Sequence, residues 1–191
     1  MASSEAPPLT PHRFTRQEFV RLVEHGVLGD ELEVELLDGV IVPVSRESPE
    51  HAALVQVLTQ LLAPVAAAGL LRVSGPVAAG DWSLPRPDLA VVPPADPTDH
   101  PSDVALAIEV VVAAKTAARY KIGVYGAARV TEYWIVDVPG RSVEVFTEPG
   151  PRGYGRHEPR RGSDLLALPA FGVAFEAAEL FARAGLLPSE G

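Results

Sequence analysis

One stretch of the chain is far more apolar than the rest, and it limits the folds that are available. Residues 104–112 read Val-Ala-Leu-Ala-Ile-Glu-Val-Val-Val, in which Glu109 is the single charged residue. A short continuous run rich in Val and Ile is typical of a strand that is buried on both faces. Both faces of such a strand must be covered, so we expect a central mixed sheet with helices packed on it, in the α/β or α+β class.

The other patterns predict elements in an order that fits such a sheet. Thr15 and Glu18 have the spacing of a capping box and open a first helix. Asp38-Gly39 lies between two β-rich runs, which predicts a hairpin. The later elements are expected as the two hairpin strands 33–37 and 40–44, a helix at 49–68 that Pro64 bends or shortens, strands at 70–77, 89–92 and 104–112, a helix at 113–128, a second hairpin of 132–138 and 142–147, a Gly/Arg-rich loop at 149–162, and a short strand with a closing helix within 164–184.

Length and composition favour one domain. The chain has 191 residues and shows no internal repeat, so we expect a single domain over 14–185 with flexible segments at 1–13 and 186–191. The chain has 16 Gly and 19 Pro, too few for low complexity, and 47% of its residues are hydrophobic, enough for a core. The chain contains no Cys, which excludes disulfides, Cys-ligated zinc and thiol nucleophiles.

Charge and hydropathy restrict the partners and the compartment. A net charge of −9 does not attract nucleic acid over the whole surface. Neither a signal peptide nor an apolar run long enough to span a membrane is visible, so we expect a cytoplasmic protein without membrane contact. One segment is basic and contains Arg152, Arg156, Arg160 and Arg161. A solvated loop is its simpler interpretation, and a phosphate clamp is the alternative.

Two carboxylates adjoin apolar strands. An ionised Glu109 inside a core strand is unfavourable unless it is paired or binds a metal, the alternative being a strand-end residue that points to solvent. Asp88 directly precedes the apolar run 89–92, and taken alone it would be a turn residue beside Pro87. The number of residues between Asp88 and Glu109 allows a strand, a loop and a second strand. If the two strands are neighbours, the two carboxylates lie side by side. Two hard oxygen donors suit Mg²⁺ or Mn²⁺.

Three further residues could act with this pair. Lys121 lies one to two turns into the helix after the carboxylate strand, where it could orient a water or stabilise phosphoryl charge, or simply face solvent. Lys115 and Lys121 are the only lysines among 16 Lys and Arg residues. Glu35 alternates with apolar neighbours in the first hairpin. It is either a charge on an edge strand or a residue of the site. His51 opens the long helix. It is either a surface residue or a residue that acts as a general base or contacts a phosphate near the site.

Six short motifs follow one another along the chain. They are 34–39 (Val-Glu-Leu-Leu-Asp-Gly), 49–51 (Pro-Glu-His), 86–92 (Arg-Pro-Asp-Leu-Ala-Val-Val), 107–110 (Ala-Ile-Glu-Val), Lys121 with Tyr125, and 130–137 (Val-Thr-Glu-Tyr-Trp-Ile-Val-Asp). Together they resemble the Uma-type restriction endonuclease family, within the PD-(D/E)xK nuclease superfamily, over about residues 14–182. This resemblance implies a restriction-endonuclease-like fold, in which a mixed central sheet is flanked by helices and carries an acidic site at one edge.

The resemblance also implies how the metal would be held. Asp88 and Glu109 would bind Mg²⁺ or Mn²⁺, with the Val110 carbonyl as a further ligand. In the superfamily a lysine follows the glutamate by two positions, a place that Val111 occupies here. The lysine of the Uma-type family lies instead in the following helix, which matches Lys121.

Two more residues match the family and some neighbours do not. The family's early glutamate matches Glu35, and its helix-opening histidine matches His51. Related sequences carry small hydroxyl residues where this chain has Ala113 and Ala114, and an Asp where it has Ala-Ala-Arg at 117–119, which includes Ala118. Metal ligands that lack supporting polar groups are held less well.

The expected function is therefore metal-dependent hydrolysis of DNA phosphodiester bonds. A homodimer is also expected, because the hairpin at 132–147 could offer an exposed edge. The alanines and the net charge of −9 support an alternative, a catalytically degenerate member that acts as a non-enzymatic binding or regulatory protein. A metal hydrolase acting on a small phosphorylated substrate is a further alternative. No helix-turn-helix, zinc finger or long basic helix indicates which DNA would be recognised.

Overall fold

A mixed sheet of six strands forms the centre of the computed structural model, which describes residues 11–28, 33–44, 48–94, 96 and 99–186. Its strands, in spatial order, are β3 (Leu71–Val73), β4 (Leu89–Val91), β5 (Leu106–Val111), β6 (Glu132–Asp137), β7 (Ser142–Gly150) and β8 (Gly153–Arg160). Only β5 and β6 run parallel, and α4 (Thr116–Ala127) connects them. The predicted fold class, a mixed sheet flanked by helices, is confirmed.

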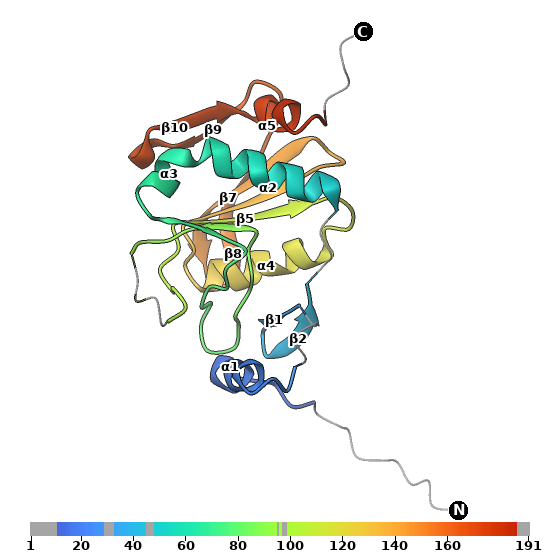
Figure 1. Cartoon of the computed structure of the whole chain (residues 1–191), viewed down its shortest axis with the longest axis vertical. Coiled ribbons are helices and arrows are strands. Elements are labelled where there is room, and N and C mark those ends of the chain that lie inside the picture. The colour runs from blue at the N-terminus through green and yellow to red at the C-terminus, as the bar shows by residue number, and fades with distance from the viewer. Residues whose placement is uncertain (1–10, 29–32, 45–47, 95, 97–98, 187–191) are drawn as a thin grey trace, which may run out of the picture.

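Helices cover both faces of this sheet (Figure 1). The remaining elements are α1 (Arg16–Glu24), β1 (Val34–Leu37), β2 (Val40–Pro43), α2 (Pro49–Leu61), α3 (Ala63–Ala67), β9 (Leu165–Leu168), the 3-10 turn η1 (Pro169–Phe171), β10 (Val173–Glu176) and α5 (Ala177–Arg183). One face carries α2, with α5 and the β9–β10 hairpin outside it, and the other face carries α4. α1 and the β1–β2 hairpin lie beyond α4, at the blue end of the ribbon.

Strand β5 divides its side chains between the two cores. Leu106 and Ile108 pack into the core that includes α2, whereas Ala107 and Val111 pack into the core that includes α4. Side chains alternate along a strand, so Glu109 faces α4. The single charge of the apolar stretch is therefore directed at the helix that carries Lys121.

The first hairpin forms as expected but stays separate from the main sheet. Asp38 and Gly39 have φ angles of 46° and 79°, the positive values of a type I′ turn. A single bridge, Leu36 to Leu84, joins the β1–β2 pair to the chain that precedes β4. In α1, the capping box of Thr15 and Glu18 is also present.

Several boundaries differ from the prediction. The helix expected at 49–68 divides at Leu62 into α2 and α3, because Pro64 cannot continue it. The strand expected at 70–77 shortens to three residues. The closing segment contains two strands, where one was expected. Of the flexible ends that were predicted, 1–10 and 187–191 lie outside the described residues.

The prediction of a loop at 149–162 is wrong, because most of this segment is β8. The start of β8 packs closely on α4 instead. A Cβ atom on Gly126 of α4 would lie 2.3 Å from the carbonyl oxygen of Gly153 at the start of β8. Tyr154 contributes its ring to the α4 side of the sheet, next to Tyr133 and Phe146.

This extra strand changes the expectation for the second hairpin. β7 pairs with β6 on one side and with β8 on the other. The segment 132–147 therefore has no exposed edge, and the edges of the main sheet are β3 and β8. Within the described residues, no helix combines the length and the apolar composition that crossing a membrane requires.

Candidate active site

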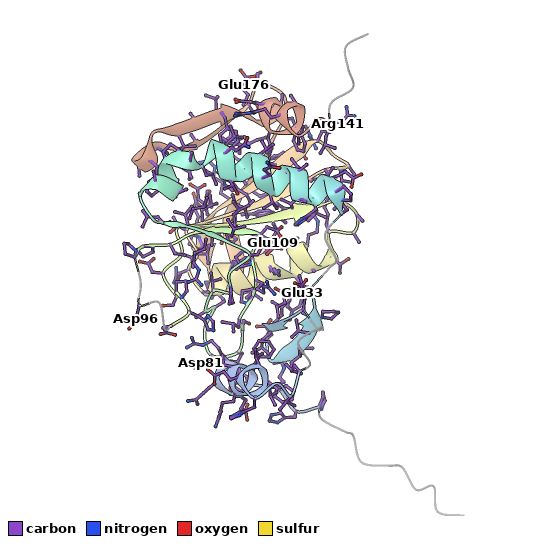
Figure 2. The ribbon with its side chains drawn as sticks, viewed as in Figure 1. Glu33, Asp81, Asp96, Glu109, Arg141 and Glu176 are labelled. Carbon is purple, nitrogen blue, oxygen red and sulfur yellow. The ribbon has the colours of Figure 1, made fainter. Side chains whose placement is uncertain are left out.

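The site forms around Glu109, between β5 and α4 (Figure 2). Its side chain is 13% exposed. One oxygen, Oε1, accepts hydrogen bonds from Lys121 Nζ at 2.9 Å and from the Tyr125 hydroxyl at 3.2 Å. Lys121 and Tyr125 are four residues apart on α4, so both donors come from the same helix face. Neither bond involves Oε2, which leaves that oxygen for another ligand.

Lys121 joins the main sheet to the first hairpin. Its Nζ also lies 2.8 Å from Oε2 of Glu35, and both side chains are almost completely buried. The same Glu35 oxygen accepts the backbone N–H of Arg86 at 2.9 Å. Glu35 is thus neither an edge charge nor exposed to solvent, and Lys121 is not a solvent-facing helix residue.

Asp88 lies immediately before the first residue of β4, and it lines the same cleft as Glu109. Its Oδ2 accepts the backbone N–H of Val110 at 2.6 Å, just beyond the last β4–β5 pair, Leu89 with Ile108. The N–H and C=O of one strand residue point to the same edge, so the Val110 carbonyl also faces this side. The other Asp88 oxygen lies 3.0 Å from Nε2 of His51.

Local structure holds His51 at this position. Ser48 caps α2 by accepting the backbone N–H of His51 at 3.3 Å, and Pro49 follows it in the first turn. The histidine side chain is 10% exposed. The structure therefore brings Asp88, Glu109, Lys121, Glu35 and His51 together around one cleft.

Burial and charge alter the acid–base behaviour of this cluster. Burial raises the pKa of the Glu109 carboxyl to about 7, and the negative charges of Asp88 and Glu35 act in the same direction. Burial alone would lower the pKa of Lys121, but the charges of Glu109 and Glu35 outweigh it, so the ammonium is retained. Burial also raises the pKa of Tyr125 far above its usual value, so its hydroxyl remains a donor.

All of these carboxylates border one cleft of about 290 Å³. Its walls come from β1 and β2, the start of α2, the ends of β4 and β5, and α4. Four alanines form part of the wall, Ala113, Ala114, Ala117 and Ala118. The small size of these side chains leaves room beside Lys121.

The arginine segment lies away from this cleft. Arg156 and Arg160 both form ion pairs with Glu158 on β8. Three strand spacings separate β8 from β5, about 14 Å. Arg152 and Arg161 are exposed and are also not among the described residues that line the cleft.

Lys115, the other lysine, forms ion pairs that the sequence did not indicate. Lys115 Nζ pairs with Asp137 and, at 3.1 Å, with Glu144. Glu144 is buried and also pairs with Arg119 and His157. Sequence reasoning likewise missed the roles of Tyr125 and of the Arg86 N–H, although both residues fall inside the motifs quoted above.

Comparison with known proteins finds one family model and a solved structure of similar fold. The family model Uma2, described as "Putative restriction endonuclease", matches residues 16–180. A crystal structure from Anabaena variabilis ATCC 29413, described as "a putative nuclease belonging to DUF820", has a TM-score of 0.71 and 18% sequence identity, and the match covers 90% of this chain and 99% of that chain. At that identity the similarity establishes the fold. No curated protein matches the sequence at a significant level.

Proposed function

Since this chain belongs to the Uma2 family, we propose that it is a metal-dependent nuclease that hydrolyses DNA phosphodiester bonds in the cleft beside Glu109. One observation carries the proposal. A buried lysine, Lys121, bonds to Glu109 at the point where Asp88 enters the same cleft. Two carboxylates with one adjacent compact cation are suited to phosphoryl chemistry, in which charge stabilisation supplies most of the catalysis.

The donor set fits Mg²⁺ or Mn²⁺. Within the part of the chain that is described, no three His, Asp or Glu side chains are arranged as a metal cluster. Mg²⁺ is commonly held by one or two carboxylates and takes its other ligands from water and substrate phosphate, so two carboxylates suffice. Asp88, Oε2 of Glu109 and the Val110 carbonyl would hold the ion. When bound, it would lower the pKa of a ligated water and offset phosphate charge.

The chain's own residues position and stabilise the reacting groups. Tyr125 and Lys121 hold Oε1 of Glu109, which directs Oε2 away from α4. Nε2 of His51 lies 3.0 Å from Oδ1 of Asp88, and this contact restricts the rotation of the carboxylate. Lys121 supplies a compact positive charge to a phosphoryl oxygen entering the cleft, and Glu35 keeps that ammonium in place.

Cleavage of plasmid and linear DNA with Mg²⁺ or Mn²⁺ tests the proposal. Asp88→Asn and Glu109→Gln should abolish metal-dependent cleavage, whereas the matched variant Asp103→Asn, at an exposed position outside the cleft, should retain it. Lys121→Arg should lose on the order of a hundredfold or more, as expected when one preorganised electrostatic partner is lost. Lys115→Arg is its control, because arginine preserves the pairs with Asp137 and Glu144.

Cleavage that survives Asp88→Asn and Glu109→Gln would show that the activity arises elsewhere. A parent protein that folds, yet cleaves no DNA with any divalent ion, would contradict the proposal. The non-enzymatic binding role would then take its place, with the alanine-lined wall at 113–118 as the reason for the silent site.

A further inference from the structure

A second cavity lies beside the cleft, between α1, β1 and the segment that joins β3 to β4. Its volume is about 490 Å³. Apolar side chains form most of the wall, including Val20, Val23, Leu28, Val34 and Leu84. Cavities of this size and character are typical of sites for small organic groups.

Arg86 connects the two cavities. It lines both of them, and its backbone N–H bonds to Glu35 in the cleft while its Nε donates to the Ser74 carbonyl at 3.1 Å. A small hollow shares Ser74 and Arg86 with the second cavity, and it shares Arg86, His51 and Asp88 with the cleft. Arg86 and Asp88 are two residues apart, so their Cα atoms are separated by at most about 7 Å. A group in the second cavity would therefore lie next to a phosphodiester in the cleft.

We propose that this second cavity binds an unpaired base of the substrate strand, adjacent to the phosphodiester that is cut. This inference rests on the proposed nuclease function. A nucleobase has apolar faces and a polar edge, which matches a mostly apolar wall whose polar members are Glu24, Ser74, Arg86 and His100. A base in a duplex must leave its stack to enter such a cavity, so strands that are already unpaired are the favoured substrate.

The distribution of charge supports an unpaired substrate. Duplex binding draws most of its affinity from Lys and Arg residues that neutralise several phosphates. Among the described residues that line the cleft, the Lys and Arg residues are Arg86 and Lys121, and Lys121 already bonds to two carboxylates. A bound base supplies affinity that phosphate contacts at this site do not, and it does so without attraction from a chain of net charge −9.

An abasic scan tests the proposal on the unaltered protein. Single-stranded oligodeoxynucleotides, each with one abasic position, are cleaved in Mn²⁺ beside intact single-stranded and duplex controls. We expect faster cleavage of the single strand, and a loss of at least about fivefold at one position next to the cut, the lower range for one bound base. Equal cleavage of single strand and duplex, with no sensitive position, would overturn the proposal.

Two variants, one on α1 and one in the turn that follows it, test whether this cavity holds the base. Val23 lines the cavity and is 49% exposed, so Val23→Phe should fill its mouth without disturbing the core. Val27 is 64% exposed and is not among the described lining residues, so Val27→Phe is the matched control. Val23→Phe should lower cleavage of the intact strand to the abasic level and remove the effect of the abasic position. Mn²⁺ affinity should be unchanged.

The outcomes separate this inference from the proposed function. Metal-dependent cleavage with no abasic effect, or an abasic effect that persists fully in Val23→Phe, would refute the base cavity and leave the nuclease intact. The absence of cleavage of every DNA form would refute the nuclease and the base cavity together.

Discussion

Glu109 should make the metal-free protein less stable as the pH rises, and Glu109→Gln should remove that effect. The pKa of this carboxyl is about 7 in the folded protein, against 4.5 as its ordinary value. Between these values the folded protein binds a proton that the unfolded chain has released. The stability associated with Glu109 is therefore complete below about pH 4.5 and is lost as the pH rises through 7.

The size of the effect follows from the pKa. At about 1.4 kcal/mol per pH unit, the displacement from 4.5 to about 7 corresponds to about 3 kcal/mol of unfolding free energy. The glutamine side chain of the variant cannot ionise but keeps nearly the same shape as glutamate. The difference in stability between Glu109→Gln and the parent should therefore grow by about 2–3 kcal/mol in favour of the variant from pH 5 to pH 8.

Urea denaturation in EDTA at pH 5, 6, 7 and 8 measures this difference. Comparing variant with parent at each pH cancels the titration of the other groups. Glu144→Gln is the control, because Glu144 is also buried but pairs with Lys115 and Arg119. It should lose about 1 kcal/mol at pH 8, since its cations are partly exposed and hydrogen bonds to charged groups contribute modestly. A pH-independent difference for Glu109→Gln would refute the reasoning.

Three further predictions concern the same region. Lys121→Ala leaves two buried carboxylates without their cation and should lower the unfolding free energy by about 3–5 kcal/mol in urea denaturation; a loss below about 1 kcal/mol would contradict the buried pairing. Mn²⁺ at a hundred times its dissociation constant should stabilise the parent by about 2.7 kcal/mol but not Asp88→Asn, measured by thermal unfolding; equal stabilisation would place the ion elsewhere. Gly126→Ala puts a methyl group against the Gly153 backbone and should cost about 1–3 kcal/mol in urea denaturation, whereas Gly123→Ala, on open space, should not.

The sequence predicted the parts of the site that local pattern controls. A single glutamate inside an apolar strand indicated a buried carboxylate, and Asp38-Gly39 indicated the hairpin that presents Glu35. Lys121 was distinguished by the scarcity of lysine and by its spacing from Glu109. Each of these signals comes from residues close in sequence or from the period of one element.

What the sequence did not show depends on contacts between distant segments. β8 reads as a loop because its glycines and arginines resemble turn composition, yet the backbone of Gly153 packs directly on Gly126 of α4. The pairs of Lys115 join the start of α4 to β6 and β7, and no local pattern indicates them. Arg86 borders two cavities because α1 and β1 pack beside the chain that leads into β4.

The site lies at the junction of two parts of the fold, and this explains why Glu35 is buried. The β1–β2 hairpin is not part of the main sheet, and it is held there by backbone bonds to the chain before β4, such as the Leu84 N–H to the Leu36 carbonyl at 2.8 Å, together with side-chain contacts. Tyr120 donates its hydroxyl to Asp38 at 2.7 Å, and the next residue on α4, Lys121, pairs with Glu35 at 2.8 Å. The same lysine orients Glu109. Because one ammonium both fixes the hairpin and holds the carboxylate, movement of the hairpin away from α4 would disturb Glu109 directly, and Glu35 acts on the chemistry through Lys121.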